Sequence, residues 1–395
     1  MAHEQFHGIG DEDVSQPRFR PLTRSAISRR AIVKSLVGAS LAGIPAPAVA
    51  AALPDISGAD STSVHASKSR KRKRQIKAIY LNPLATTDWA GFMRLVEIIE
   101  RTELNALVID IKEDAVYYDT QVDFFRNAQD VTPLYDLSDR LDELHKRGIH
   151  AIARQVVFKD WRAAEARPDL AVKIIGTNSV WRDQNGIAWV NPFQHELWQA
   201  NADLAREAAK LGFDEIQYDY VRFPSDGNLA VMDFGQPYTE QARSDAIVQF
   251  LIETRKRLDG TGAKLGADIF GYTLVVNNDN GIGQTADRIG RVVDAVCPMI
   301  YPALWPTGSL PVGGVPNDFP HDTIAIAMDR ARTKLGANVT KTRPWLQDFS
   351  LPGYRPYGAA DVRAQIDAVE AAKVGGWMIW NPANDYHQEA FKVKR

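Results

Sequence analysis

The feature that most constrains the fold is a regular alternation of strand-like and helix-like segments from Gln75 to the C-terminus. Short apolar runs are each followed by an amphipathic stretch with capping residues at its ends. We expect strands over segments 76–82, 106–112, 149–158, 213–219, 264–271, 295–301, 343–349 and 376–381. We expect helices over segments 88–101, 137–147, 195–211, 240–258, 285–292, 323–335 and 360–373.

Uninterrupted strand–helix repetition is typical of an α/β protein with a parallel sheet, and eight such units are typical of a (β/α)8 TIM barrel. The eighth helix is weak in this sequence, and we expect the tail from Asp385 to replace it. The alternative is an open doubly wound sheet, which usually carries a Gly-rich phosphate turn after its first strand. No such turn follows Asn82, so the sequence predicts a barrel that forms a single domain over residues 75–395.

The N-terminal region has the order of a targeting segment. Residues 28–34 read Ser-Arg-Arg-Ala-Ile-Val-Lys and resemble the twin-arginine (Tat) export signal of bacteria. A mildly apolar run over 35–44 follows, and small residues up to Ala50 fit a signal-peptidase site. The apolar run is too short for a membrane-spanning helix. We therefore expect a signal peptide over 1–50, recognition by the twin-arginine export machinery, and a periplasmic or extracellular location. The alternative is a chance Arg-Arg pair before an Ala-rich linker.

The charge of the chain is unevenly distributed. Residues 1–74 hold 12 Lys and Arg against 6 Asp and Glu, whereas the whole chain of 395 residues has a net charge of −2. The remainder is therefore acidic, which argues against a nucleic-acid partner. Segment 51–74 ends in a basic run over 68–74 and is predicted to be a disordered linker. A third alternative is a structural protein of the cell envelope, which residues 68–74 would hold to an anionic polymer.

Nearly every predicted strand ends in a side chain that can ionise or form hydrogen bonds, and catalytic residues of TIM barrels lie at these ends. The expected substrate-binding residues are Asp110, Lys112, Arg154, Gln217, Arg222, Tyr301, Trp380 and Asn381. Aromatic rings above a polar floor suit sugars, which stack on rings and form hydrogen bonds through their hydroxyls. The loops supply such rings at Trp161, Trp181, Trp189, Tyr272, Trp305 and Tyr354.

Glycoside hydrolysis needs two carboxyl groups, one that donates a proton and one that attacks or activates water. Asp219 and Asp268 end neighbouring predicted strands, and neighbouring strands lie about 5 Å apart, which suits the roughly 5–5.5 Å separation of a retaining pair. Arg222 could pair with Asp219 and keep it ionised as a nucleophile. Asp268 lies next to Ile269 and Phe270, so we expect a raised pKa and an acid role. The alternative for Asp219 and Arg222 is a structural ion pair at a strand end.

Other chemistries fit less well. The chain has no His-x-His or Glu-x-x-His pair at a strand end, so we expect no metal and no cofactor. Cys297 is the only cysteine and lies in an apolar strand pattern, which predicts a buried structural thiol.

Four segments together resemble a bacterial family of glycoside hydrolase domains, a domain of unknown function related to the α-amylase-like barrels. They lie at 106–112, 190–192, 212–224 and 298–302, and the resemblance spans about residues 76–385. It implies that Asp219 is the nucleophile after strand four, Asp268 the acid after strand five and Asp348 a supporting carboxylate after strand seven. Asp268 stands where those enzymes have Glu, and Gln217 stands where they have Arg.

The sequence therefore predicts an exported glycoside hydrolase that acts on a polysaccharide or a cell-envelope glycan. The alternative from another functional class is a non-catalytic carbohydrate-binding TIM barrel of the cell envelope.

Overall fold

The computed structural model describes residues 75–394. The predicted signal peptide over 1–50 and the predicted linker over 51–74 lie outside the described residues.

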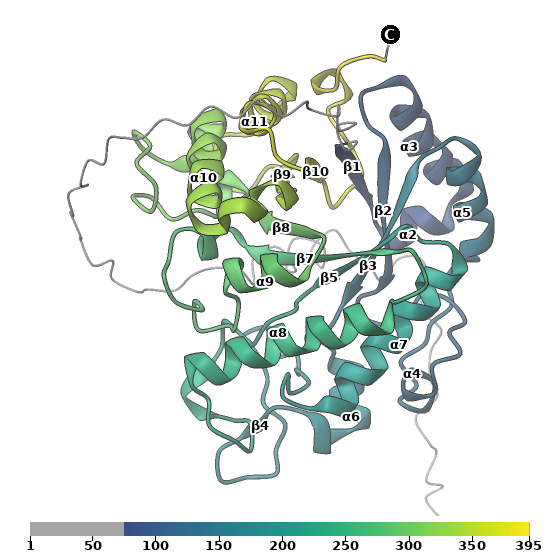
Figure 1. Ribbon diagram of the computed structural model, residues 1–395, viewed down its shortest axis with the longest axis vertical. Helices are drawn as coiled ribbons and strands as arrows, with labels where there is room; N and C mark the ends of the chain where they lie inside the picture. The colour runs from purple at the N-terminus through teal and green to yellow at the C-terminus, as the bar shows by residue number, and fades with distance from the viewer. Residues whose placement is uncertain (1–74, 395) are drawn as a thin grey trace, which may run out of the picture. The chain divides into compact units, whose positions relative to one another are not determined.

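Eight parallel strands close into a barrel, as the sequence predicts (Figure 1). Around the barrel the order is β1, β10, β9, β8, β7, β5, β3 and β2. The strands are β1 Ile76–Leu81, β2 Ala106–Lys112, β3 His150–Val156, β5 Glu215–Asp219, β7 Lys264–Phe270, β8 Ala295–Met299, β9 Trp345–Gln347 and β10 Gly376–Trp380. Each predicted strand is present, and the TIM-barrel prediction is confirmed.

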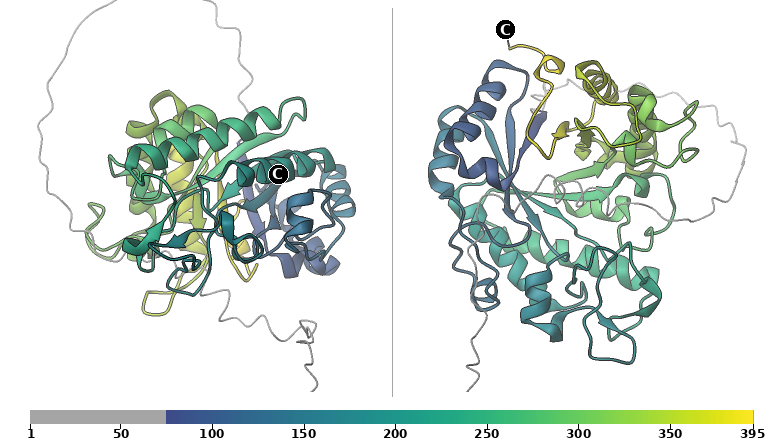
Figure 2. Two further views of the ribbon diagram at one scale, coloured as in Figure 1. Left: turned by 90° about the horizontal axis from the view of Figure 1, so that it is seen from below. Right: turned by 180° about the vertical axis from the view of Figure 1, so that it is seen from behind.

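The predicted helices are also present and lie around the outside of the strands (Figures 1 and 2). They are α3 Trp89–Arg101, α5 Leu137–Lys146, α7 His195–Leu211, α8 Glu240–Arg257, α9 Ala286–Val292, α10 Pro320–Leu335 and α11 Ala359–Ala372. The connections hold short elements that the sequence analysis did not predict: α2 Pro83–Thr87, α4 Asp123–Asn127, α6 Trp161–Ala166, β4 Lys173–Ile174 and β6 Met232–Asp233.

Strand alternation on β5 separates the helix-facing side chains from those inside the barrel. Tyr218 points outward, where its hydroxyl donates to the carbonyl of Asn201 on α7 and its ring stacks on Phe250 of α8. Successive side chains of a strand face opposite sides, so Gln217 and Asp219 point into the barrel. The same alternation on the other strands brings buried polar side chains together inside the barrel.

A buried ion pair between Glu215 of β5 and Arg343, just before β9, lies in a lower layer of the barrel interior. A Cβ on Gly266 of β7 would stand only 2.9 Å from Oε1 of Glu215, so glycine leaves the room that this carboxylate occupies.

The C-terminal tail takes the place of an eighth helix, as expected. Beyond β10 the described tail holds only the short 3-10 helix Gln388–Ala390. The tail runs beside the chain that follows α3, where Thr102 and Val393 form a β-bridge (Figure 2). Phe391 stacks on Trp377 of β10 at 6.2 Å between ring centroids.

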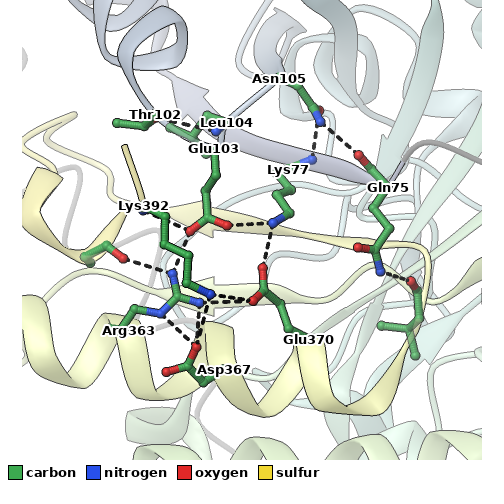
Figure 3. A network of polar contacts seen from close by, with 12 residues as sticks. Gln75, Lys77, Thr102, Glu103, Leu104, Asn105, Arg363, Asp367, Glu370 and Lys392 are labelled. Carbon is green, nitrogen blue, oxygen red and sulfur yellow. Dashed lines mark hydrogen bonds and ion pairs between the residues drawn. The ribbon is translucent and has the colours of Figure 1, made fainter. Parts of the chain in front are cut away.

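An ion-pair network joins this tail to the first strand and the last helix (Figure 3). Nζ of Lys77 on β1 lies 2.6 Å from Glu103 and 2.6 Å from Glu370 of α11. Arg363 of α11 also pairs with Glu103 at 2.6 Å, and Lys392 of the tail pairs with Glu370 at 3.0 Å. The network therefore closes the barrel between its first and last units.

No helix between residues 75 and 394 is both long enough and apolar enough to cross a membrane. Cys297 is a buried free thiol, as predicted, and burial raises its pKa to about 12.

Candidate active site

Arg154 of β3 is the centre of a charged cluster at the C-terminal ends of β2, β3 and β5. Its Nε and Nη2 donate to Oδ2 of Asp219 at 3.0 and 2.6 Å. Its Nη1 donates to Oδ1 of Asp110 at 2.6 Å. Asp110 and Arg154 are paired residues in the register of β2 and β3, so strand pairing itself sets this contact. The cluster unites three residues that the sequence analysis selected.

Two rings from the adjoining strands β1 and β10 complete the cluster. The Tyr80 hydroxyl of β1 donates to Oδ2 of Asp110. Trp380 of β10 stacks on the Tyr80 ring at 4.0 Å between centroids and lies 5.3 Å from the guanidinium of Arg154. Trp380 is half-buried, so it retains surface toward solvent.

Arg222 does not pair with Asp219, which corrects the expectation from the sequence. The chain turns at Tyr220 with φ of 49°, and the Tyr220 amide donates to Oδ1 of Asp219 at 2.6 Å. Beyond this turn the Arg222 guanidinium lies 4.9 Å from the Trp189 ring and 4.6 Å from the Phe270 ring. Burial there lowers the pKa of Arg222. The positive charge beside Asp219 therefore comes from Arg154.

Asp268 of β7 is buried, with a residue exposure of 1%. Its Oδ1 accepts hydrogen bonds from Nε2 of Gln217 and Nε1 of Trp345, both at 2.8 Å. Burial raises the pKa of Asp268 well above its usual value, and the charge of Asp219 raises it further. The direction agrees with the acid role expected from the sequence. Gln217 is fully buried beneath the cluster and has no surface for a sugar, so its expected substrate-binding role is not supported.

Tyr301 lines a small apolar cavity of about 70 Å³ beyond β7 and β8. The cavity is lined by Phe270, Gly271, Tyr272, Met299, Tyr301, Leu304, Trp305 and Pro306. Burial, with the charges of Asp268 and Asp219, raises the pKa of Tyr301 well above its usual value. Three aromatic residues that the sequence analysis proposed for sugar contact, Tyr272, Tyr301 and Trp305, therefore share one cavity.

Other aromatic candidates have different surroundings. Trp181 and Trp189 are buried core residues, whereas Tyr354 is exposed. A larger surface hollow of about 560 Å³ lies between α4, α6 and α7, and none of the residues lining it belongs to the Arg154 cluster.

Lys112 is not available to a substrate, contrary to expectation. The register of β2 and β3 shifts between Asp110 and Lys112, and such an irregularity re-aims a side chain. The Lys112 ammonium is fully buried, pairs with Asp160 at 2.7 Å and donates to the Val156 carbonyl at 3.2 Å.

Asp348 and Asn381 bind the C-terminal tail, and their expected roles in catalysis and substrate binding stay predictions. Both oxygens of the fully buried Asp348 carboxylate bind His387, one to the imidazole and one to the backbone amide. Burial raises the pKa of Asp348, and the hydrogen bond from His387 opposes that rise. Nδ2 of Asn381 donates to the carbonyls of Asp348 and Asp385.

Glu113 was missed by the sequence analysis. It follows Lys112 at the end of β2, and its Oε1 lies 3.9 Å from Nη2 of Arg154. Burial raises the pKa of Glu113 to about 7. Arg154 opposes the rise, and the charges of Asp110, Asp114 and Asp219 add to it. Its position in the sequence could have identified it, because Glu113 is the first acidic residue beyond a strand that carries Asp110.

Within residues 75–394, no group of three or more His, Cys, Asp or Glu side chains is arranged to hold a metal ion.

A family model described as "Putative glycosyl hydrolase domain" matches residues 78–386. The glycoside hydrolase domain of PgaB (BpsB) from Bordetella bronchiseptica is 12% identical, with a TM-score of 0.60, covering 81% of this chain and 99% of that chain. A class V chitininase from Pseudomonas fluorescens Pf-5 is 11% identical, with a TM-score of 0.50, covering 80% of this chain and 98% of that chain. At these identities the two structures show a common fold.

A hypothetical protein from Ruminiclostridium thermocellum ATCC 27405 is 33% identical over 48% of this chain and 96% of that chain, with a TM-score of 0.43. No curated protein matches the chain at a significant level.

Proposed function

The chain belongs to the family of glycosyl hydrolase domains whose model matches residues 78–386, its activity class is glycoside hydrolysis, and we propose that Asp219 is its reacting carboxylate. The observation that supports this role is the Arg154 cluster. Arg154 holds both Asp110 and Asp219, but the Asp110 side chain is 0% exposed and the Asp219 side chain 10%. A group that attacks a sugar must contact it, so Asp219 is the member of the pair that can do so.

The reaction also requires a second, protonated carboxyl group. In retaining hydrolysis one carboxylate attacks the anomeric carbon while the other carboxyl protonates the leaving oxygen. Asp268 is the donor expected from the sequence, and its raised pKa favours the neutral acid. Its residue exposure is 1%, which limits its contact with a substrate.

We propose a polysaccharide or a cell-envelope glycan as the substrate, bound over the C-terminal ends of the strands. Support comes from the half-buried Trp380 beside Arg154. Rings of this kind stack on the C–H faces of sugars, and the neighbouring polar groups can bind hydroxyls.

We also propose export by the twin-arginine route to the periplasm or beyond, supported by the sequence pattern over residues 28–50. Fusing residues 1–50 to a reporter enzyme tests this proposal. The reporter should appear outside the cytoplasm, and replacement of Arg29 and Arg30 by lysine should keep it inside. Export that does not depend on the two arginines would contradict the proposed route.

A glycan-array screen, followed by an assay for new reducing ends on each hit, tests the enzymatic proposal. Wild-type protein should bind and cleave at least one glycan, and Asp219→Asn should bind it but cleave at least about 1,000-fold more slowly. Asp119→Asn is the matched control, because the Asp119 side chain is 74% exposed and pairs with Arg126 on the surface. Binding without cleavage by the wild type would favour a carbohydrate-binding barrel, and cleavage by Asp219→Asn would exclude its assigned role.

A further inference from the structure

Glu113 and Asp219 share one nitrogen of Arg154. Nη2 of Arg154 lies 2.6 Å from Oδ2 of Asp219 and 3.9 Å from Oε1 of Glu113. These two carboxyl oxygens are therefore at most about 6.5 Å apart, the sum of the two distances, whereas retaining pairs are separated by about 5–5.5 Å and inverting pairs by about 6.5–9.5 Å. This upper bound lies at the lower limit of the inverting range and includes the retaining separation, so the two carboxyl groups can flank a single glycosidic bond.

Exposure distinguishes Glu113 from the other acids of the site. The side chains of Glu113 and Asp219 are 30% and 10% exposed, while Asp110 is 0% and Asp268 is 1% exposed. A general acid must come within hydrogen-bond distance of the oxygen that it protonates. Glu113 satisfies this requirement with the largest accessible surface of the four.

The hydrogen bonds of the four acids also distinguish Glu113 from the other three. Tyr80 and Arg154 bind Asp110, Gln217 and Trp345 bind Asp268, and Arg154 and Tyr220 bind Asp219. Among the residues that the structure describes, no donor forms a hydrogen bond with the Glu113 carboxyl group. Its oxygens are therefore free to exchange a proton with a bound glycan.

We infer that Glu113, and not Asp268, is the catalytic proton donor of a retaining mechanism. This assignment rests on the proposed role of Asp219. The Glu113 carboxyl gives its proton to the glycosidic oxygen as the bond from C1 to that oxygen breaks, and the bonding electrons go to the leaving oxygen. The Asp219 carboxylate forms the new bond to C1. The Glu113 carboxylate then removes a proton from water, the water oxygen attacks C1, and Asp219 leaves as a carboxylate.

The electrostatics agree with these two roles. A pKa of about 7 keeps much of Glu113 protonated near neutral pH, where it can act as an acid. The negative charge of Asp219 is one cause of that raised pKa. Formation of the glycosyl-enzyme ester removes this charge, so the pKa of Glu113 falls and the group becomes a carboxylate ready to act as the base.

Leaving-group dependence in the full-length chain tests the assignment. The probes are 2,4-dinitrophenyl and phenyl glycosides of glucose, galactose, glucosamine and N-acetylglucosamine in both anomeric forms, together with any glycan-array hit. A good leaving group needs little protonation, so Glu113→Gln should lose at least about 100-fold in kcat/KM on phenyl glycosides or the glycan and less than about 10-fold on dinitrophenyl glycosides. Azide should restore turnover of Glu113→Ala and give a glycosyl azide that retains the substrate's configuration.

Three variants separate the possible outcomes. Asp119→Asn changes a surface carboxylate that is 74% exposed and should leave activity within about 3-fold of wild type. Asp268→Asn should keep the leaving-group dependence of the wild type; if it shows the dependence expected for Glu113→Gln, Asp268 is the donor and the inference is overturned. Asp219→Asn with undiminished hydrolysis would overturn the proposed function itself, whereas an inactive Asp219→Asn beside a fully active Glu113→Gln would overturn only the inference.

A second measurement does not depend on a substrate. The folded-state pKa of Glu113 lies above its usual value of 4.5, so ionisation of this group destabilises the fold as pH rises from about 4.5 to 7. The Tm of Glu113→Gln should therefore rise relative to wild type between pH 5 and pH 8. Parallel Tm curves over this range would show that Glu113 titrates normally and would contradict its assignment as the acid. Absence of hydrolysis by the wild type on all probes and array hits would overturn both the proposed function and the inference.

Discussion

Replacing Arg154 with glutamine should destabilise the barrel by about 3–5 kcal/mol at pH 8, the usual cost of removing one partner from a buried ion pair. Arg154 lies 2.6 Å from both Asp110 and Asp219, and its side chain is 3% exposed. Without the guanidinium, two carboxylates would face each other in the barrel with little solvent to screen them.

Proton uptake sets an upper limit on this cost. The variant can protonate Asp110, whose usual pKa is 3.8, at a free-energy cost of about 1.4 kcal/mol for each pH unit above that value. The limit for Asp110 is therefore about 6 kcal/mol at pH 8 and about 2 kcal/mol at pH 5. Burial already raises the pKa of Asp110 in the wild type, and Arg154 opposes that rise. Without Arg154 the folded-state pKa of Asp110 rises further above its unfolded value, so the destabilisation grows as pH rises from about 4 to 8 and is relieved as pH falls.

Urea unfolding followed by tryptophan fluorescence measures the destabilisation at pH 8 and at pH 5. The difference in unfolding free energy between wild type and Arg154→Gln should shrink by at least about 1 kcal/mol at the lower pH. Adding Asp110→Asn to the variant should recover about 2 kcal/mol at pH 8, because one of the facing charges is removed.

Arg126→Gln is the matched control, since Arg126 pairs with Asp119 at 3.2 Å on the surface and should cost less than about 1 kcal/mol. A pH-independent loss below about 1 kcal/mol for Arg154→Gln would refute the view that Arg154 neutralises two buried carboxylates.

Three further outcomes are expected. Glu103→Gln removes the carboxylate that joins β1 to α11 (Figure 3) and should cost about 1–3 kcal/mol in thermal unfolding. Asp367→Asn changes the outer carboxylate of the same network, which is 52% exposed, and should cost less than about 1 kcal/mol; equal losses would contradict a special role for Glu103. Gly376→Ala should cost more than about 3 kcal/mol in the same assay, because Gly376 has φ of 137° and a Cβ there would overlap the backbone of β1. Gly353→Ala is the control, at φ of 87° with open space around it, and should cost about 1–2 kcal/mol; a similar cost at both positions would count against the steric argument. The wild-type kcat/KM should fall about 10-fold per pH unit above pH 7, since Glu113 must be protonated to donate and its pKa is raised to about 7. If kcat/KM instead begins to fall with a midpoint below about pH 5, another group controls the activity.

The positions of the strands and most helices follow from local sequence patterns. Each strand is a short apolar run and each long helix has an apolar face, so these elements could be predicted within a few residues of their ends. The short helices α2, α4 and α6 were missed, because five or six residues are too few to establish a helical period. Strand-end position was also sufficient to select Asp110, Arg154 and Asp219 as candidate site residues, since catalytic residues of TIM barrels lie at the C-terminal ends of the strands.

The pairing of those side chains could not be obtained in the same way. Arg222 is closer to Asp219 in sequence, but the turn at Tyr220 directs it toward aromatic rings, and Arg154 from the neighbouring strand takes its place. The bulge in β2 buries Lys112, and the folded-back tail covers Asp348 with His387. These outcomes depend on contacts between segments that are distant in the chain.

The sequence by itself therefore determined the barrel, the family and the face that carries the charged groups, because strand alternation and strand-end position are local properties of the chain. Only the tertiary structure decided which carboxyl group is buried, which is exposed and which shares a guanidinium with another. Burial and distance set the charge state of an acid, and both arise only when the barrel closes. For this reason Glu113, one residue beyond a predicted strand, emerged as a candidate acid only in the folded protein.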